Sequence, residues 1–125
     1  MGGKRGFEDF EVWRDALDLA DDIYRGSNRG PFADDRALKD QIRRASISVV
    51  SNIAEGFESR TTGLYVDFLG RAKASAGEMR AQLHLVQRLG YVDDETASEL
   101  TSRVTSISRQ LCGLMKYLER SNNPK

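Results

Sequence analysis

The sequence has few residues that bind metals or cross-link a chain. Its one cysteine, Cys112, cannot form an internal disulfide. Because the chain also has only one histidine, His84, it lacks the set of cysteine and histidine ligands that a zinc site needs. The two prolines leave room for long helices. No apolar run approaches the ~20 residues that a membrane-spanning helix needs. These absences predict a cytoplasmic chain that does not enter a membrane and uses no metal or cofactor.

Net charge is also absent, because the chain has 19 basic and 19 acidic residues. A dedicated nucleic-acid-binding domain usually has a basic excess, so this balance argues against one. The charges are nevertheless unevenly distributed. Residues 1–25 have four basic and seven acidic side chains, and residues 58–90 have five basic and three acidic ones. A local basic surface in the middle of the chain is therefore compatible with the zero total.

Four segments have apolar residues at steps of three and four, which is typical of amphipathic helices. They span about 11–25, 36–55, 64–89 and 94–118. In the first segment the predicted apolar stripe consists of Trp13, Ala16, Leu17, Ala20, Ile23 and Tyr24. Asp34 or Asp35 is expected to cap the second segment and Gly56 to end it. The stretch 26–35, which contains Gly30-Pro31, is expected to be a loop.

The last segment shows the most regular pattern. Seven apolar residues alternate steps of three and four, as in a heptad seam: Ala97, Leu100, Val104, Ile107, Leu111, Leu114 and Leu118. Short connections between helices favour antiparallel neighbours. We therefore predict an all-α fold, an antiparallel up-down four-helix bundle over residues 9–120, with flexible ends at 1–8 and 121–125.

A line of small residues accompanies the apolar stripe of the third segment. It consists of Gly70, Ala74, Gly77 and Ala81, at spacings of four, three and four. Small side chains at this spacing let another backbone approach closely. The line indicates either a tight contact inside the bundle or a contact between subunits.

The second segment contains the most informative polar residues. Arg44, Ser48, Ser51 and Glu55 share the predicted solvent side. Arg43 instead falls within the apolar arc, where a guanidinium is costly unless it is paired. Glu78, which borders the line of small residues, is the expected partner, either within one chain or between subunits. A direct role of Arg43 in ligand binding is the alternative.

Few residues could support catalysis. A Cys–His pair would require Cys112 and His84 to meet, and packing is the simpler role for a cysteine beside the heptad seam. Arg80 precedes His84 on one helix face, but the spacing differs from the Arg and His motif of small helical ribonucleases. We therefore expect a protein that is not an enzyme. Ribonuclease activity that His84→Ala abolishes would contradict this.

Several short motifs resemble those of one bacterial family. They are Phe10-Glu11-Val12-Trp13, Gln41-Ile42-Arg43-Arg44-Ala45, Asn52-Ile53-Ala54-Glu55-Gly56, Phe68-Leu69, Ser75 with Glu78, and Leu89-Gly90-Tyr91. This combination resembles the four-helix bundle proteins encoded in intervening sequences of bacterial 23S ribosomal RNA genes. The resemblance covers residues 7–120. The candidate interface or ion-pair residues are, besides the line of small residues, Arg43, Arg44, Asn52, Glu55 and Glu78, which all lie in or beside these motifs.

The resemblance implies a homopentameric ring or barrel. The family resembled also has a relative, the accessory variability protein of diversity-generating retroelements. That relative is a basic pentamer that binds a reverse transcriptase and nucleic acid. The candidate nucleic-acid contacts here are Arg71, Lys73, Arg80 and Arg88. Two hypotheses follow. In the first, the chain is a homo-oligomeric scaffold, with a pentamer expected, that binds a protein partner such as a reverse transcriptase. In the second, it is an accessory protein that binds RNA or DNA.

Overall fold

The structure of the protein is a computed structural model that describes residues 6–122. The described part is helical: a short 3-10 helix η1 (Phe7–Asp9) precedes α1 (Glu11–Gly26), α2 (Gly30–Asp34), α3 (Arg36–Glu58), α4 (Thr62–Arg88) and α5 (Asp94–Asn122). The predicted all-α fold is confirmed. α2 is an additional short helix in the stretch that was expected to be a loop.

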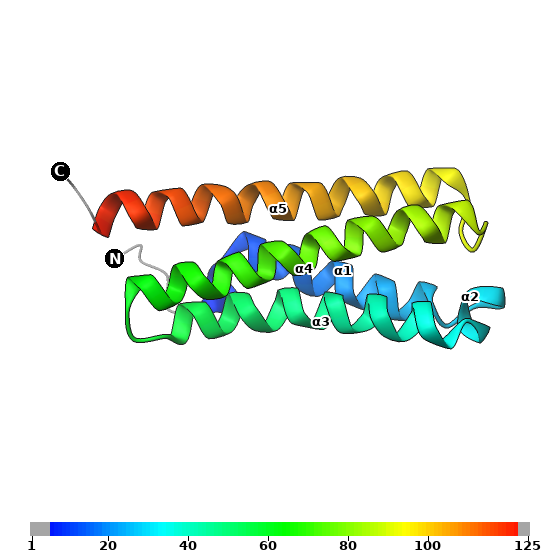
Figure 1. Ribbon diagram of the computed structural model, residues 1–125, viewed down its shortest axis with the longest axis horizontal. Helices are drawn as coiled ribbons and strands as arrows, with labels where there is room; N and C mark the ends of the chain where they lie inside the picture. Colours follow the sequence, from blue (N-terminus) through cyan, green and yellow to red (C-terminus); the bar gives the residue numbers. More distant parts are fainter. Residues whose placement is uncertain (1–5, 123–125) are drawn as a thin grey trace.

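The long helices α1, α3, α4 and α5 lie side by side, and those that follow one another run in opposite directions (Figure 1). α3 packs against both α1 and α4, and α5 packs against both α4 and α1. Each long helix therefore buries one side against two neighbours. None of the helices within residues 6–122 combines the length and the apolar character that a membrane crossing requires.

Side chains before three of the helices accept hydrogen bonds from their first turns. Asp35 Oδ1 accepts from the Leu38 amide at 3.1 Å, Thr61 Oγ1 from the Leu64 amide at 3.1 Å, and Asp93 Oδ1 from the Thr96 amide at 2.7 Å. Each bond satisfies an amide that has no partner within its helix, which favours starting the helix there. Of the two caps predicted for the second segment, the structure selects Asp35.

The prediction that Gly56 ends the second helix is wrong, because α3 continues to Glu58. Gly56 is buried inside the helix where α4 crosses closely. A Cβ at this position would lie 2.9 Å from Tyr65 Cδ1 and 3.1 Å from Phe68 Cβ. The glycine therefore permits close approach of two helices and does not terminate one.

Two packed aromatic rings hold α2 against the connection between α4 and α5. Phe32 of α2 is buried and stacks on Tyr91 from the α4–α5 connection, with ring centroids 5.3 Å apart. Gly90 has a positive φ of 72° and follows the end of α4. The Gly90 amide donates to Gln87 O at 3.0 Å and the Tyr91 amide to Val86 O at 3.1 Å, which is a Schellman motif. This motif ends α4 and places Tyr91 over α2.

The core follows the apolar residues at steps of three and four in the last three segments. Its most completely buried large side chains come from all four long helices: Leu19, Ile42, Ile53, Leu69, Met79, Leu83, Val86, Val104, Ile107 and Leu111. In α5, the heptad residues from Ala97 to Leu111 are buried, whereas Leu114 and Leu118 are half-buried.

The predicted stripe of α1 is partly wrong. Leu17 is 44% and Tyr24 38% exposed, whereas Val12 and Leu19, outside the predicted stripe, are buried. Ala16, Ala20 and Ile23 are buried as predicted, so the buried side is turned by about 60°. At Tyr24, the ring lies against an arginine guanidinium instead of the apolar core.

The predicted flexible ends are only partly described. Residues 1–5 and 123–125 lie outside the described residues. In the described part of these ends, Phe7 packs on Trp13, with ring centroids 4.9 Å apart, and α5 continues to Asn122.

Candidate interaction surface

Arg43 joins α3 to the end of α1. Its Nε donates to Ser27 Oγ at 2.8 Å and its Nη2 to Tyr24 O at 3.0 Å. Its guanidinium carbon also lies 4.4 Å from the centroid of the Tyr24 ring, a cation–π distance. Ser27 is itself fully buried. Arg43 is therefore held by the Tyr24 ring and by two oxygens, one from Tyr24 at the end of α1 and one from Ser27 directly after it, and it fixes the position of that helix end.

The prediction that Arg43 and Glu78 form an ion pair within one chain is wrong. Arg43 lies on the side of α3 that faces α1, whereas Glu78 is exposed on α4, the neighbour on the other side. Glu78 Oε2 accepts only from Gln82 Nε2 at 3.3 Å, one turn along α4, within the described residues. A contact of either residue with another subunit stays a prediction.

Asn52 belongs to a polar contact between α3 and α4. Ser48 Oγ and Ser75 Oγ lie 2.7 Å apart across the two helices, and Asn52 Nδ2 donates to Ser48 Oγ at 2.9 Å. The expectation that Ser48 and Ser51 face solvent is wrong, because both are half-buried. Small hydroxyls that satisfy one another let the helices approach closely here. Arg44 and Glu55 are exposed on the same helix.

The line of small residues on α4 lies mostly at the surface. Ala74, Gly77 and Ala81 are exposed, and Gly70 is half-buried. A Cβ at Gly70 would lie 3.7 Å from Met115 Cε of α5, an ordinary contact, and a Cβ at Gly77 would meet nothing within 4 Å. The interpretation as a tight contact inside the bundle is therefore wrong. The interpretation as a contact between subunits stays open.

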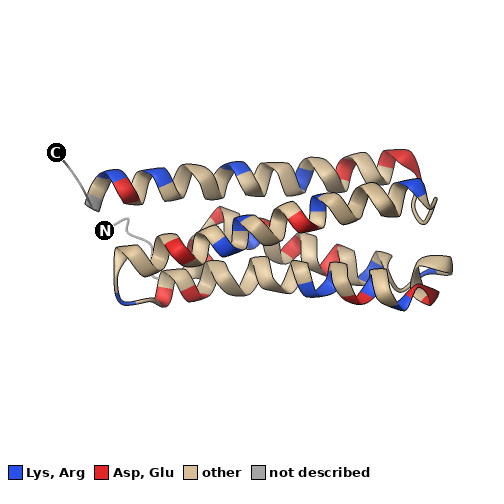
Figure 2. Cartoon of the chain, viewed as in Figure 1, with Lys and Arg blue, Asp and Glu red and all other residues tan. Residues whose placement is uncertain are grey.

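The four candidate nucleic-acid contacts are all exposed on α4. Arg71 lies over the Phe68 ring, with its guanidinium carbon 5.1 Å from the centroid. Within residues 6–122 the ion pairs join Arg25 to Asp21 and Arg103 to Asp22 and Glu99, so none involves Arg71, Lys73, Arg80 or Arg88. Lys and Arg also gather on the half of α3 nearest α2, and Asp and Glu recur along α1 (Figure 2).

His84 and Cys112 lie on different helices and do not form a hydrogen bond within the described residues. His84 is exposed on α4 and Cys112 is half-buried on α5. Within residues 6–122, no three His, Cys, Asp or Glu side chains are grouped so that they could hold a metal ion.

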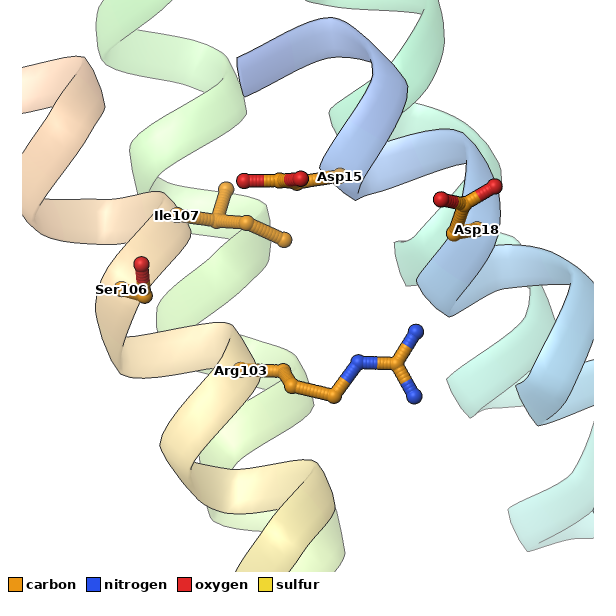
Figure 3. A pocket seen from close by; sticks show the side chains of 5 residues that line it. All are labelled: Asp15, Asp18, Arg103, Ser106 and Ile107. Atoms are coloured by element: carbon orange, nitrogen blue, oxygen red, sulfur yellow. The ribbon is translucent and has the colours of Figure 1, made fainter. Parts of the chain in front are cut away.

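The sequence did not predict the surface between α1 and α5. A cavity of about 240 Å³ opens there and is lined by Asp15, Asp18, Arg103, Ser106 and Ile107 (Figure 3). Arg103 Nη1 donates to Asp22 Oδ2 at 2.8 Å, and Gln110 Nε2 donates to Asp15 Oδ2 at 3.0 Å. The acidic excess of residues 1–25 indicates only that this part of the chain is polar and does not specify the contact.

Comparison with known proteins identifies the relatives of the chain. The sequence profile of the 23S rRNA-intervening sequence protein family matches residues 8–113. A crystal structure of a protein with unknown function, from the S23 ribosomal protein family of Bacteroides thetaiotaomicron, superposes with a TM-score of 0.78. It shares 23% sequence identity, and the alignment covers 84% of this chain and 95% of that one. At this identity the superposition shows the fold alone.

A search of curated proteins gives no match. The family match nevertheless includes most of the described helices, from η1 into the second half of α5, and agrees with the resemblance of the short motifs. The chain therefore belongs to the family of 23S rRNA-intervening sequence proteins.

Proposed function

We propose that the protein is a non-enzymatic cytoplasmic scaffold: an antiparallel up-down four-helix bundle that assembles with copies of itself and binds a protein partner. The outward side of α4 carries this proposal. Three of its four small residues are exposed, and at Gly77 no neighbour within the chain requires a small side chain. A glycine in a helix interior costs about 1 kcal/mol relative to alanine. A second copy of the chain that packs closely on α4 gives these small residues a use.

Five copies are the assembly that the family resemblance favours. A contact between unlike surfaces of neighbouring copies closes into a ring when the rotation between copies allows it. The ring would place the exposed Glu78 close to a neighbouring copy. It would also repeat any charged surface once per chain.

Light scattering after size exclusion tests the assembly. We expect a mass near five chains of 14.0 kDa, about 70 kDa. Gly77→Leu adds a large side chain to the outward side of α4, and we expect it to lower the mass to that of smaller species. Gly113→Leu is the matched control, because Gly113 is also an exposed helical glycine with nothing within 4 Å of an added Cβ. A wild-type mass near 14 kDa at micromolar concentration would refute the proposal.

A second candidate function is RNA binding. The exposed side chains of Arg71, Lys73, Arg80 and Arg88, which have no ion pair within residues 6–122, favour it. A ring would multiply these charges. Binding through phosphates releases counterions, so the affinity for RNA should fall steeply as salt rises. Titration of labelled RNA at low and high salt measures this, and Arg71→Gln with Lys73→Gln should weaken it. An absence of binding at low salt would eliminate this function.

A further inference from the structure

Two adjoining cavities lie between α1 and α5, and the proposed assembly surface on α4 uses neither. The first is the polar cavity that Asp15 and Asp18 line (Figure 3). The second, of about 180 Å³, has mainly apolar walls that include Ile23, Phe32, Val86 and Leu100. Arg103 lines both, so the two cavities lie next to each other on either side of its side chain, and together we call them the α1–α5 groove.

The polar part of the groove has an excess of negative charge. Asp18 is exposed and takes part in no hydrogen bond or ion pair within residues 6–122, and Asp15 accepts only from the neutral amide of Gln110. Arg103 reaches across from α5, but its guanidinium is bound to Asp22 at 2.8 Å and lies 3.9 Å from Glu99 (Figure 3). A cation entering beside Asp15 and Asp18 would therefore meet carboxylates that no cation of the described chain neutralises.

The apolar part is large enough for one side chain. A cavity of roughly 150 Å³ holds a benzene-sized group. The 180 Å³ here therefore fits a leucine or phenylalanine side chain. Its wall also contains Gly26, where an added Cβ would meet nothing within 4 Å. A buried apolar anchor of this kind supplies much of the binding free energy of peptides in grooves.

The two parts are offset along the helices. On α1 the polar part is lined at Asp15 and Asp18 and the apolar part from Asp22 to Gly26. That offset of about seven residues corresponds to roughly 10 Å, or two helical turns. A helical ligand would match it with side chains seven positions apart on one face.

We propose that the α1–α5 groove binds a basic amphipathic helix of a partner protein, with a leucine or phenylalanine in the apolar part and a lysine or arginine beside Asp15 and Asp18. Charge complementarity selects this occupant, since the phosphates of RNA would be repelled by the same carboxylates. This inference rests on the proposed function, because it says which kind of segment the scaffold holds. It leaves the outward side of α4 free for assembly.

The test uses the full chain and a fluorescein-labelled synthetic helix of about 15 residues, with leucine and lysine seven positions apart. Fluorescence anisotropy gives its Kd. We expect Asp15→Asn with Asp18→Asn, and separately Gly26→Leu, to weaken binding about tenfold. Ser106→Lys, which places a cation in the polar part from an exposed position, should weaken it as well and keeps the test valid if another variant folds poorly.

The matched control is Glu58→Gln with Asp67→Gln, which removes two exposed carboxylates from α3 and α4. It should change the Kd less than twofold. An equal loss in this control would show unspecific attraction and overturn the proposal, as would unchanged binding in Gly26→Leu. A changed solution mass in the groove variants would assign the groove to a second copy instead. If the groove variants lose peptide binding but keep the solution mass of the wild type, the result supports the groove as the peptide-binding site. If the wild type itself is monomeric, the result refutes only the proposed assembly.

Discussion

Tyr91 and Asp35 join the two connections at one end of the molecule through a hydrogen bond of 2.9 Å from Tyr91 Oη to Asp35 Oδ2. The other oxygen of the same carboxylate accepts from the Leu38 amide at the start of α3. One side chain therefore caps α3 and also ties the α4–α5 connection to it. Because Tyr91 also stacks on Phe32, α2 belongs to the same contact.

We expect Tyr91→Phe to lower the melting temperature and to change its dependence on alkaline pH. The hydrogen bond to Asp35, together with burial and the Asp35 charge, raises the pKa of Tyr91 above its ordinary 10.0. The folded state thus holds the phenol proton more tightly than the unfolded state. This stabilisation is complete below pH 10 and is lost as the pH rises through the raised pKa. Thermal melts between neutral and strongly alkaline pH measure it.

Tyr117→Phe is the control for this prediction. Tyr117 is 64% exposed and forms no hydrogen bond within residues 6–122. Its replacement should leave the melting temperature and its alkaline dependence close to those of the wild type. Equal effects of the two substitutions would contradict the role assigned to the Tyr91–Asp35 bond.

Adding one methyl group should have opposite effects at two glycines. In Gly56→Ala the methyl group meets Tyr65 and Phe68 at 2.9 and 3.1 Å, so we expect a net loss of about 1 kcal/mol in the free energy of unfolding. In Gly77→Ala it meets nothing within 4 Å, and we expect the isolated chain to gain about 1 kcal/mol from helix propensity. Urea unfolding at concentrations that keep the chain monomeric compares the two. The same sign at both positions would refute the packing assigned to Gly56.

Replacing Arg43 with lysine should destabilise the protein although the charge is kept. An ammonium cannot lie flat over Tyr24 and also donate to both Ser27 Oγ and Tyr24 O as the guanidinium does. We expect Arg43→Lys to cost about 1 kcal/mol. Arg44→Lys, at the exposed neighbouring position, should stay within about 0.5 kcal/mol of the wild type. Urea unfolding of both variants decides this, and equal losses would show that Arg43 has no special role.

Periodicity predicted the elements well wherever a helix buries a continuous apolar stripe. The stripes of α3, α4 and α5 recur in the core because their buried residues keep to one face. It failed on α1, where Tyr24 reads as apolar in the sequence but packs under Arg43. It also failed at Gly56, because a glycine that admits a neighbouring helix looks the same in a sequence as one that ends its own.

Contacts between distant residues account for the remaining differences. The place of Arg43 in an apolar arc marks it as unusual in the sequence. Its partners at the end of α1 and directly after it lie 19 and 16 positions away, and no local pattern specifies them. The α1–α5 groove depends on how far α1 stands from α5, which is set by packing across the whole core. Aspartates on one side of α1 indicate only that this side is polar.

The order of the helices in space has a consequence for folding. α3, α4 and α5 are neighbours both along the chain and in the structure, joined by connections of only a few residues, whereas α1 must pack on α5 at the far end of the sequence. Contacts between segments close in sequence form quickly because little loop entropy is lost. The hairpins of α3 with α4 and α4 with α5 are therefore expected to form early. α1 also packs on α3, so only its contact with α5 spans most of the sequence, and this contact would complete the core.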